Sequence, residues 1–402
     1  MEMTLDHKTE LNSGIQRSVT VLGSTGSVGR NTLDLIAREP DRFKVEVLTG
    51  NRNVKLLAEQ ARIFKPAHVA VGDESGYEDL KSELSGMKID ISAGRKALVE
   101  AAMRPSDLVL AGIVGTAGLE PTMAAAERGA IIGLANKEGL VCAGNMLVEA
   151  VKQNDGALIP VDSEHNAIYQ VFDFRQSDSV ERLILTASGG PFRETPIDKM
   201  SRATPKEAVA HPNWDMGAKI SVDSATMMNK GLELIEAYYL FPVREEQIEI
   251  LVHPQSVVHS MVEYVDGSVL AQLGSPDMRT PISYALSWPT RMTTPSPRLQ
   301  LDKIANLTFE APDIKRFPAL DLARQALQAG GTAPATLNAA NEVAVRYFLD
   351  ETIGFLDICG VVADVLTEMP TLELNSMDEV YEIDGEARGR AEQLVKRLAS
   401  NK

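Results

Sequence analysis

The sequence has few cysteines and fewer basic than acidic residues. Its two cysteines, Cys142 and Cys359, lie far apart and show no CxxC spacing. We therefore expect neither a disulfide framework nor a thiolate metal site. The small number of cysteines fits a protein of the reducing cytoplasm. The 40 basic against 56 acidic residues give a formal charge of −16, which argues against a nucleic-acid or anionic-membrane partner. An anionic substrate must be bound by a local group of donors.

Long apolar runs and targeting signals are also missing. The longest apolar stretch, residues 108–119, is rich in glycine and too short to span a bilayer. Residues 1–17 contain no apolar core of a signal peptide, so we expect a disordered tail there. The sequence shows no internal repeat, and 402 residues are enough for two or three domains.

A glycine-rich loop stands near the start of the ordered chain. A strand-like run, residues 18–22, leads directly into Gly23-Ser-Thr-Gly-Ser-Val-Gly29, and a helical pattern follows over residues 32–37. Glycines alone often mark only a turn. Between a strand and a helix they favour a dinucleotide site, because they let the backbone approach a pyrophosphate at the helix N-terminus.

The end of the next strand bears on the choice of cofactor. Residues 43–48 are strand-like and lead into Gly50, Asn51, Arg52 and Asn53. An enzyme that uses NADH places an acid about here for the ribose 2′-hydroxyl. This chain has Arg52 instead, which favours NADPH, although a plain surface arginine is the alternative.

Short apolar strands then alternate with helical segments, which predicts a parallel sheet with right-handed crossovers. We expect this doubly wound domain over residues 18–161. Its last strand delivers Asn136, Lys137 and Glu138 to the sheet edge where ligands of such folds bind. Lys137 is either a substrate or nicotinamide contact there, or a surface lysine. The further expected strands are residues 68–71, 89–91, 108–111 and 130–134.

An apolar run over residues 157–161 ends in Asp162, Ser163 and Glu164. If these residues continue a strand, Asp162 and Glu164 point to the same face and can bind one hard cation. The alternative is a solvated pair of acids.

Two downstream turns are candidate substrate contacts. A buried strand over residues 182–188 runs into two glycines, so Ser188 at its end is either in an anion-binding nest or in an ordinary turn. Residues 196–219 are rich in proline and include His211, Trp214 and Met216. We interpret this segment as a flap with Trp214 as its cover; a surface aromatic is the alternative.

A helix is expected from about residue 221 to Leu240. On it Asn229 lies four residues and Lys230 three residues before Glu233, so the three side chains share a face. Ser224 is expected near the helix start, where N–H groups are available to a phosphate. The helix therefore offers donors for an anion and a third oxygen ligand for the cation. The alternative is that Lys230 and Glu233 form only a solvated ion pair.

The rest of the chain completes the expected fold. Residues 256–264 and 268–273 predict an antiparallel pair in a central domain spanning 162–288, and His253 and His259 are expected to be structural. A proline-rich linker, 289–313, precedes a helical domain over 314–402. The predicted fold is an α/β protein with an N-terminal Rossmann-type sheet, a central α+β catalytic domain and a C-terminal helical bundle.

Seven blocks of this sequence resemble motifs of the 1-deoxy-D-xylulose 5-phosphate reductoisomerase family, and they occur in the family's order. The resemblance implies a cytoplasmic, homodimeric enzyme that uses NADPH and a divalent cation, with Mg²⁺ and Mn²⁺ as the first candidates and Co²⁺ as a further one. It would make 2-C-methyl-D-erythritol 4-phosphate in the non-mevalonate isoprenoid route and be inhibited by fosmidomycin. The blocks are Gly23–Gly29, Leu134–Glu138, Pro160–Asn166, Ser188–Arg193, His211–Trp214, Ser221–Glu233 and His253–Ser256.

The resemblance also implies roles for individual residues. Asp162, Glu164 and Glu233 would be metal ligands and, with Lys137, catalytic residues. Phosphate would be held by Ser188, Ser224, Asn229 and Lys230, with His211 near the substrate. Ser163 and Lys137 would contact other substrate oxygens, Trp214 and Met216 would belong to the flap, and Thr25, Gly26, Ser27 and Val28 would bind the cofactor. Gly139, Asp215 and Ala218 depart from the family pattern.

Three carboxylates suit Mg²⁺ or Mn²⁺, which would act as a Lewis acid on the substrate ketone. The sequence does not distinguish a retro-aldol/aldol course from a one-step ketol shift. One alternative function is a metal-independent NADP-dependent dehydrogenase of another phosphorylated or carboxylated substrate. Another is a non-catalytic nucleotide-binding regulator. Neither needs a metal ligand set.

Overall fold

A computed structural model describes residues 16–214 and 216–400 of the chain. Contacts group these residues into two compact units. The first unit contains the described residues up to Gly139 together with Asn145–Tyr169 and Asp277–Pro297, and the second contains the remainder. Most of the expected tail, 1–17, lies outside the described residues, and Arg17 is the first residue of strand β1.

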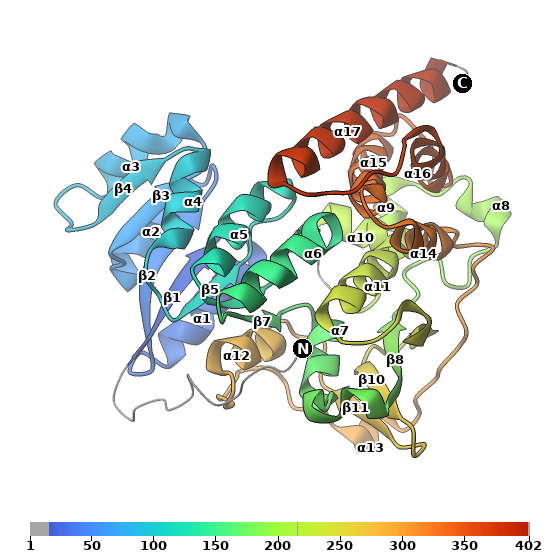
Figure 1. The fold of residues 1–402 in the computed structure, drawn as a ribbon, viewed down its shortest axis with the longest axis horizontal. Coiled ribbons are helices and arrows are strands. Elements are labelled where there is room, and N and C mark those ends of the chain that lie inside the picture. The colour runs from blue at the N-terminus through green and yellow to red at the C-terminus, as the bar shows by residue number, and fades with distance from the viewer. Residues whose placement is uncertain (1–15, 215, 401–402) are drawn as a thin grey trace. The chain divides into compact units, whose positions relative to one another are not determined.

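The first unit is built on a seven-stranded sheet in the order β4-β3-β2-β1-β5-β6-β7, and every neighbouring pair is parallel. The strand order reverses beside β1, so the carboxyl ends of β1 and β5 form the switch point where such sheets bind ligands. The predicted Rossmann-type sheet is confirmed (Figure 1). Its strands are β1 (Arg17–Leu22), β2 (Phe43–Gly50), β3 (His68–Val71), β4 (Asp90–Ala93), β5 (Leu108–Ala111), β6 (Ile131–Leu134) and β7 (Ala157–Pro160).

Helices separate these strands because each apolar strand is followed by an amphipathic segment that covers it. In α1, for example, Leu33 and Ile36 are buried whereas Arg38 lies on the exposed side. A late segment completes the unit: α12 (Arg279–Ser287) packs against α1, β6 and β7, and the Arg17 guanidinium donates to Leu286 O at 2.8 Å. The other helices are α1 (Ser27–Arg38), α2 (Val54–Phe64), α3 (Tyr77–Glu83), α4 (Arg95–Met103), α5 (Leu119–Glu127), α6 (Glu138–Gln153) and α7 (Ser163–Val171).

The second unit contains a four-stranded sheet in the order β11-β10-β8-β9. Strand β10 runs antiparallel to both β8 and β11, whereas β8 and β9 are parallel. The predicted antiparallel pair is therefore confirmed as β10 and β11. The strands are β8 (Val180–Ala187), β9 (Ile248–Val252), β10 (Val258–Tyr264) and β11 (Val269–Leu273).

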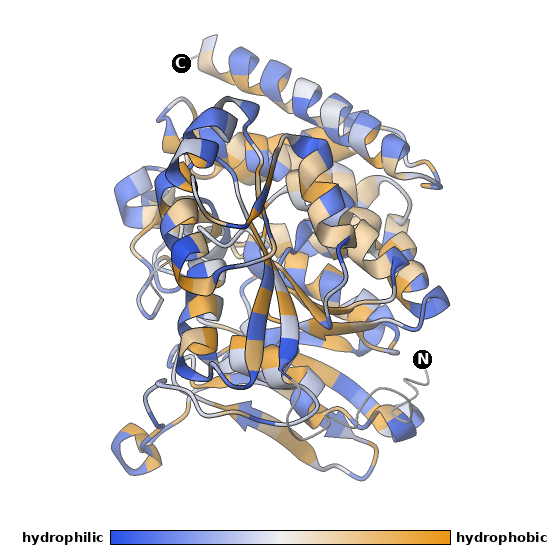
Figure 2. Cartoon of the chain, turned by 90° about the vertical axis from the view of Figure 1, so that its left-hand side faces the viewer, coloured by the Kyte–Doolittle hydropathy of each residue, from blue (hydrophilic) through white to orange (hydrophobic). Residues whose placement is uncertain are grey.

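Helices form the rest of the second unit and include the predicted C-terminal helical region. Helix α15 is buried along most of its length and packs on α14, α16 and α17. Helix α17 carries both hydrophilic and hydrophobic residues along its length (Figure 2). Its buried face is apolar because Val380, Ile383 and Ala387 recur at helical spacing. The bounds are α8 (Ile197–Met200), α9 (Pro205–Ala208), α10 (Ala218–Thr226), α11 (Met228–Leu240), α13 (Leu301–Ile304), α14 (Ala319–Ala329), α15 (Ala333–Leu349), α16 (Asp357–Glu368) and α17 (Met377–Ser400).

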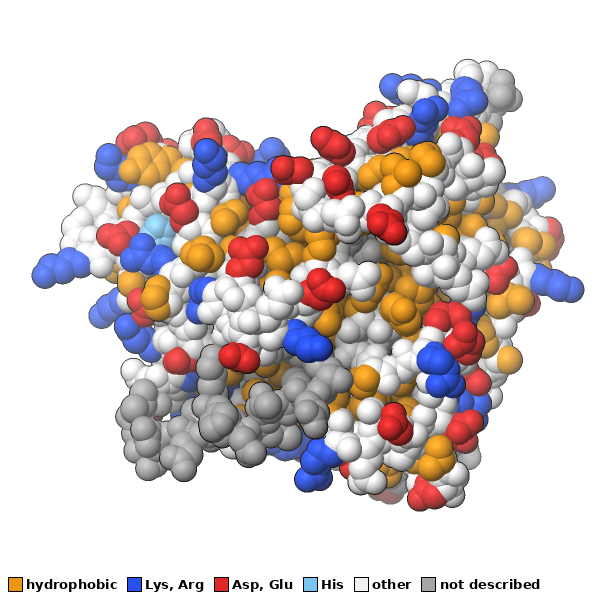
Figure 3. Space-filling model, viewed as in Figure 1, with side chains coloured by type: hydrophobic (Ala, Val, Ile, Leu, Met, Phe, Trp, Pro, Cys, Tyr) orange, Lys and Arg blue, Asp and Glu red, His pale blue; other side chains and the backbone are white. Residues whose placement is uncertain are grey.

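Charge is dispersed over the visible surface. On the face drawn in Figure 3, acidic side chains lie among basic ones. Among the described residues, no helix combines the length and the apolar character needed to cross a membrane.

Candidate active site

The glycine loop after β1 has the geometry that a phosphate-binding turn requires. Gly23 has a φ of +78°, and a Cβ there would lie 2.7 Å from Gly112 O. A Cβ on Gly29 would lie 2.4 Å from Gly23 O. These two positions admit only glycine, whereas Gly26 and Ser27 are exposed at the N-terminus of α1. The first turn of α1 therefore presents accessible N–H groups for an anion.

Two of the residues after β2 differ in role: Asn53 stabilises the next helix, whereas Arg52 is exposed to solvent. Asn53 Oδ1 accepts from Leu56 N at 3.1 Å, so this side chain caps α2. Arg52 is 82% exposed in its side chain and pairs with Asp73 at 3.1 Å. The pKa of Asp73 is lowered by hydrogen bonds from Ser75 and then from Arg52. An exposed ion pair of this kind is readily exchanged for a ligand contact.

Asn136 organises the edge of the sheet beside β5. Its amide donates to Ile113 O at 2.7 Å and to Gly115 O at 3.0 Å, and its oxygen accepts from Gly139 N at 2.6 Å. It also donates to Glu138 at 3.0 Å. These bonds hold the loop after β5 against the start of α6. Sequence reasoning did not identify this structural role.

The strand expected through Asp162 and Glu164 is wrong. Strand β7 ends at Pro160 and helix α7 begins at Ser163, so the alternation of strand side chains does not apply. Asp162 instead precedes the helix, and its carboxylate accepts from Glu164 N at 3.4 Å. Acidic residues are favoured in the first turn of a helix because free N–H groups and the helix dipole stabilise them.

The two carboxylates nevertheless lie together. An oxygen of Asp162 is within 4.8 Å of an oxygen of Glu164, and a ring nitrogen of buried His165 lies within the same distance of Asp162. Ser163 Oγ donates to Glu164, and the Lys137 ammonium pairs with Asp162. The helix start therefore brings two of the three predicted ligands together, and His165 is a neighbour that the sequence argument missed.

Ser188 follows β8 in a turn of two left-handed glycines, Gly189 (φ +83°) and Gly190 (φ +66°). Its hydroxyl lies 2.9 Å from His211 Nε2 and accepts from Gly190 N at 3.1 Å. A Cβ on Gly190 would lie 2.6 Å from Ser224 O. The turn thus joins three sequence-predicted positions, those of Ser188, His211 and Ser224.

His211 also organises the expected flap. Its Nδ1 accepts from the backbone N–H groups of Asn213 at 3.2 Å and Trp214 at 3.0 Å. Because Nδ1 is an acceptor, the ring proton is assigned to Nε2, which donates to Ser188. The Trp214 ring centroid lies 6.2 Å from that of His259. The segment contains two short helices, α8 and α9, and Asp215 lies outside the described residues.

The motif His253–Ser256 forms hydrogen bonds with the flap segment. Asn213 donates to Pro254 O at 2.8 Å and to Ser256 Oγ at 3.0 Å. The His253 imidazole, fully buried, hydrogen-bonds Thr308 O at 2.8 Å. This bond agrees with the structural role expected for His253.

The single helix expected from residue 221 to Leu240 is two helices. α10 and α11 meet at Met227, whose φ of +65° interrupts the helical backbone. Thr226 stabilises the break, because its hydroxyl donates to Asp223 O at 3.2 Å and accepts from Met228 N at 3.3 Å. Ser224 consequently lies near the end of α10, and its expected place at a helix start is wrong.

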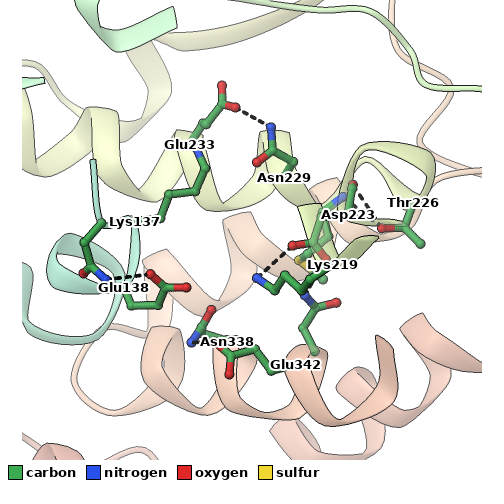
Figure 4. Close-up of polar contacts among 12 residues, drawn as sticks. Lys137, Glu138, Lys219, Asp223, Thr226, Asn229, Glu233, Asn338 and Glu342 are labelled. Carbon is green, nitrogen blue, oxygen red and sulfur yellow. Dashed lines mark hydrogen bonds and ion pairs between the residues drawn. The ribbon is translucent and has the colours of Figure 1, made fainter. Parts of the chain in front are cut away.

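The polar face on α11 is confirmed. Asn229 Nδ2 donates to Glu233 at 2.5 Å (Figure 4), and the Lys230 ammonium pairs with the same carboxylate. Lys230 is 3% and Glu233 1% exposed, so the alternative of a solvated pair is wrong. A buried ion pair is seldom retained for stability alone, since removing both charges from water offsets their attraction.

The side chains that offer metal-ligating atoms are therefore distributed over defined elements. In the first unit they are Asp162, Glu164 and His165, and in the second they are Glu233 and Glu236. Oxygen ligands of this kind suit Mg²⁺ or Mn²⁺.

Comparison with known proteins shows the same family along the chain. Residues 19–144 match the family model described as 1-deoxy-D-xylulose 5-phosphate reductoisomerase. Residues 158–241 match the model of its C-terminal domain, and residues 273–390 match one described as DXP reductoisomerase C-terminal domain.

Individual relatives agree. The 1-deoxy-D-xylulose 5-phosphate reductoisomerase of Rhodospirillum centenum is 62% identical over 94% of both chains, and that of Zymomonas mobilis is 55% identical over 95% of this chain and 98% of its own.

Solved structures agree as well. The Zymomonas mobilis enzyme in complex with NADPH has a TM-score of 0.91 at 53% identity, with 95% of this chain and 99% of the other covered. A DOX-P reductoisomerase in complex with NADPH, fosmidomycin and magnesium has a TM-score of 0.90 at 43% identity, with 96% and 99% covered. The chain belongs to the 1-deoxy-D-xylulose 5-phosphate reductoisomerase family.

Proposed function

We propose that this protein catalyses the NADPH- and divalent-metal-dependent isomerisation and reduction of 1-deoxy-D-xylulose 5-phosphate to 2-C-methyl-D-erythritol 4-phosphate. The observation that carries the proposal is the buried carboxylate of Glu233, held by Asn229 and Lys230, in a chain of this family. Neither a metal-independent dehydrogenase nor a nucleotide-binding regulator needs such a group.

Asp162, Glu164 and Glu233 are the proposed metal ligands. The close approach of the Asp162 and Glu164 oxygens supports this assignment, because two neighbouring carboxylates are stabilised by a hard cation. A bound Mg²⁺ or Mn²⁺ would polarise the substrate carbonyl as a Lewis acid. Beside these ligands, Lys137 and Ser163 would orient the substrate's remaining oxygens and hold a proton near them.

The substrate phosphate would be bound by Ser188, Ser224, Asn229 and Lys230. His211 donates its ring proton to Ser188, which leaves the serine hydroxyl proton available to a phosphate oxygen. The phosphate is remote from the reacting carbons, so its binding energy can drive closure of the flap that carries Trp214 and Met216. Closure would exclude water from the reaction.

NADPH would bind at the switch point of the seven-stranded sheet and supply the hydride. Its pyrophosphate would lie at the N-terminus of α1, and Arg52, with its exposed guanidinium, would meet the 2′-phosphate. Asn136 and Glu138 shape the same edge. The full set of proposed cofactor contacts is Gly23, Thr25, Gly26, Ser27, Val28, Gly50, Asn51, Arg52, Asn53, Asn136, Lys137 and Glu138.

We also propose a homodimer in the cytoplasm. Strand β11 is the last strand of its sheet and exposes Val269 (47%), Leu270 (48%) and Leu273 (36%). An apolar edge strand of this kind is an aggregation hazard unless a partner covers it. Among the described residues, neither Cys142 nor Cys359 is part of a disulfide, which fits a reducing compartment.

Domain roles follow from these assignments. We assign cofactor binding to residues 18–161 and catalysis and dimerisation to 162–288. The linker 289–313 leads to the C-terminal helices over 314–402.

The test is the consumption of NADPH with 1-deoxy-D-xylulose 5-phosphate, measured with and without a chelator. Glu233→Gln should abolish the metal-dependent turnover and leave NADPH binding intact, because the substitution removes a charged ligand but not the glycine loop. Turnover that survives the chelator would support the dehydrogenase, and NADPH binding without any consumption would support the regulator.

A further inference from the structure

A buried polar connection links the C-terminal helices to the helix that carries Ser224. Asn341, on α15, is 0% exposed, and its amide donates to an Asp223 carboxylate oxygen at 2.8 Å. Asp223, on α10, is 1% exposed. The other oxygen of this carboxylate lies 2.8 Å from the ammonium of Lys219. Figure 4 shows Asp223 between these two helices.

Asp223 is placed to control the local backbone. It is adjacent to Ser224, and its main-chain oxygen accepts from Thr226, the residue that stabilises the break before α11. The next helix begins at Met228 and presents Asn229 and Lys230 in its first turn. The orientation of Asp223 therefore affects both sides of the break.

Packing alone does not explain this polar contact. A buried carboxylate is destabilising unless its oxygens are hydrogen-bonded, and an apolar pair of similar size would pack the same helices without that cost. A directional amide–carboxylate bond instead sets one rotation and one register of α10 against α15. Asn338, one turn earlier on α15, is equally buried but donates within its own helix to Glu342 at 3.2 Å.

We propose that Asn341 is a positioning residue for phosphate binding: through Asp223 it holds Ser224 and the first turn of α11 in the geometry that binds the anion. This inference rests on the proposed function, in which those residues bind the substrate phosphate. The inference adds that phosphate binding requires Asn341, a residue of the C-terminal helices that lies 118 positions after Asp223 in the sequence.

The first variant is Asn341→Asp, which places two carboxylates face to face. We expect the KM for 1-deoxy-D-xylulose 5-phosphate and the Kd for inorganic phosphate to rise at least tenfold. The Kd for NADPH should change less than twofold. The matched control, Asn338→Ala, removes an equally buried amide from the same helix and should leave both phosphate readouts within twofold.

The decisive variant is the exchange Asp223→Asn with Asn341→Asp. The new amide can donate to the new carboxylate while its oxygen still accepts from Lys219, so phosphate affinity should return to within about threefold of the original. A folded Asn341→Asp protein with unchanged phosphate affinity, or a folded exchange variant that shows no recovery, would overturn the inference.

Two further measurements keep the inference testable. If Asn341→Asp does not fold, Asn341→Ser, which retains a donor, is compared with Asn341→Ala; equal phosphate affinities would overturn the inference. If the unmodified protein shows no turnover with 1-deoxy-D-xylulose 5-phosphate, the proposed function fails. The Kd for inorganic phosphate then decides the role of Asn341 separately.

Discussion

Gly190→Ala tests whether the turn after β8 and helix α10 form one anion-binding structure. A methyl group at residue 190 would lie 2.6 Å from Ser224 O and 3.0 Å from Ala225 Cα, both backbone atoms. The φ of +66° adds the cost of a left-handed alanine, about 1 kcal/mol. Relief of the overlap adds about 1–3 kcal/mol. We therefore expect a loss of about 2–4 kcal/mol in the free energy of unfolding.

Gly330→Ala separates the two contributions. Gly330 has nearly the same φ, +68°, with a ψ of −158°, and its Cβ would meet nothing within 4 Å. Gly330→Ala therefore has no steric overlap, but it carries a backbone cost of about 1–3 kcal/mol because this region of φ and ψ is essentially restricted to glycine. Denaturant unfolding measures the stabilities, and steady-state kinetics measure the KM for 1-deoxy-D-xylulose 5-phosphate. The KM should rise about tenfold or more in Gly190→Ala, about 1.4 kcal/mol of binding, and stay unchanged in Gly330→Ala. Equal effects of the two substitutions on both quantities would refute the steric reasoning.

Other predictions concern the cofactor, the flap and stability at low pH. Arg52→Ala should lose more affinity for NADPH than for NADH in fluorescence titrations, and equal losses would remove this residue from cofactor selection. Asn213→Ala removes the flap's hydrogen bonds to the turn that contains Ser256, so the substrate KM should rise several-fold while NADPH binding is unchanged. A change in NADPH affinity alone would contradict the role of these bonds in substrate binding. Burial lowers the pKa of His68 below 6.5, so the unfolded chain binds more protons below that pH and the free energy of unfolding should fall as the pH drops below 6.5. In His68→Gln, the free energy of unfolding measured by urea denaturation should depend less on pH below 6.5. An unchanged slope would show that His68 does not cause this pH dependence.

Local patterns predicted much of the fold and part of the site. Strand, glycine loop and helix over residues 18–38 were recognisable because each has a short-range signature: apolar alternation, absent side chains and helical spacing. The shared face of Asn229, Lys230 and Glu233 followed from helical geometry alone. Their burial did not follow, because exposure depends on what packs over the helix.

Predictions failed where two local structures suit the same residues. An acidic residue after an apolar strand can extend the strand or begin a helix, and at Asp162 the helix is formed. Met227 and its immediate neighbours are neither glycine nor proline, and the nearest glycine, Gly231, lies inside α11, so the break at Met227 was not predicted. It depends on hydrogen bonds of Thr226 that a periodicity argument does not include.

By itself, the sequence determined the Rossmann-type unit, the family and the chemical types of the candidate ligands, because these depend on spacing over a few residues. Only the tertiary structure decided which of these side chains are buried and what holds them. The bond between Asn341 and Asp223 joins residues 118 positions apart. Such a contact forms only when two helices pack in one register, and neither helix alone contains a signal for its partner.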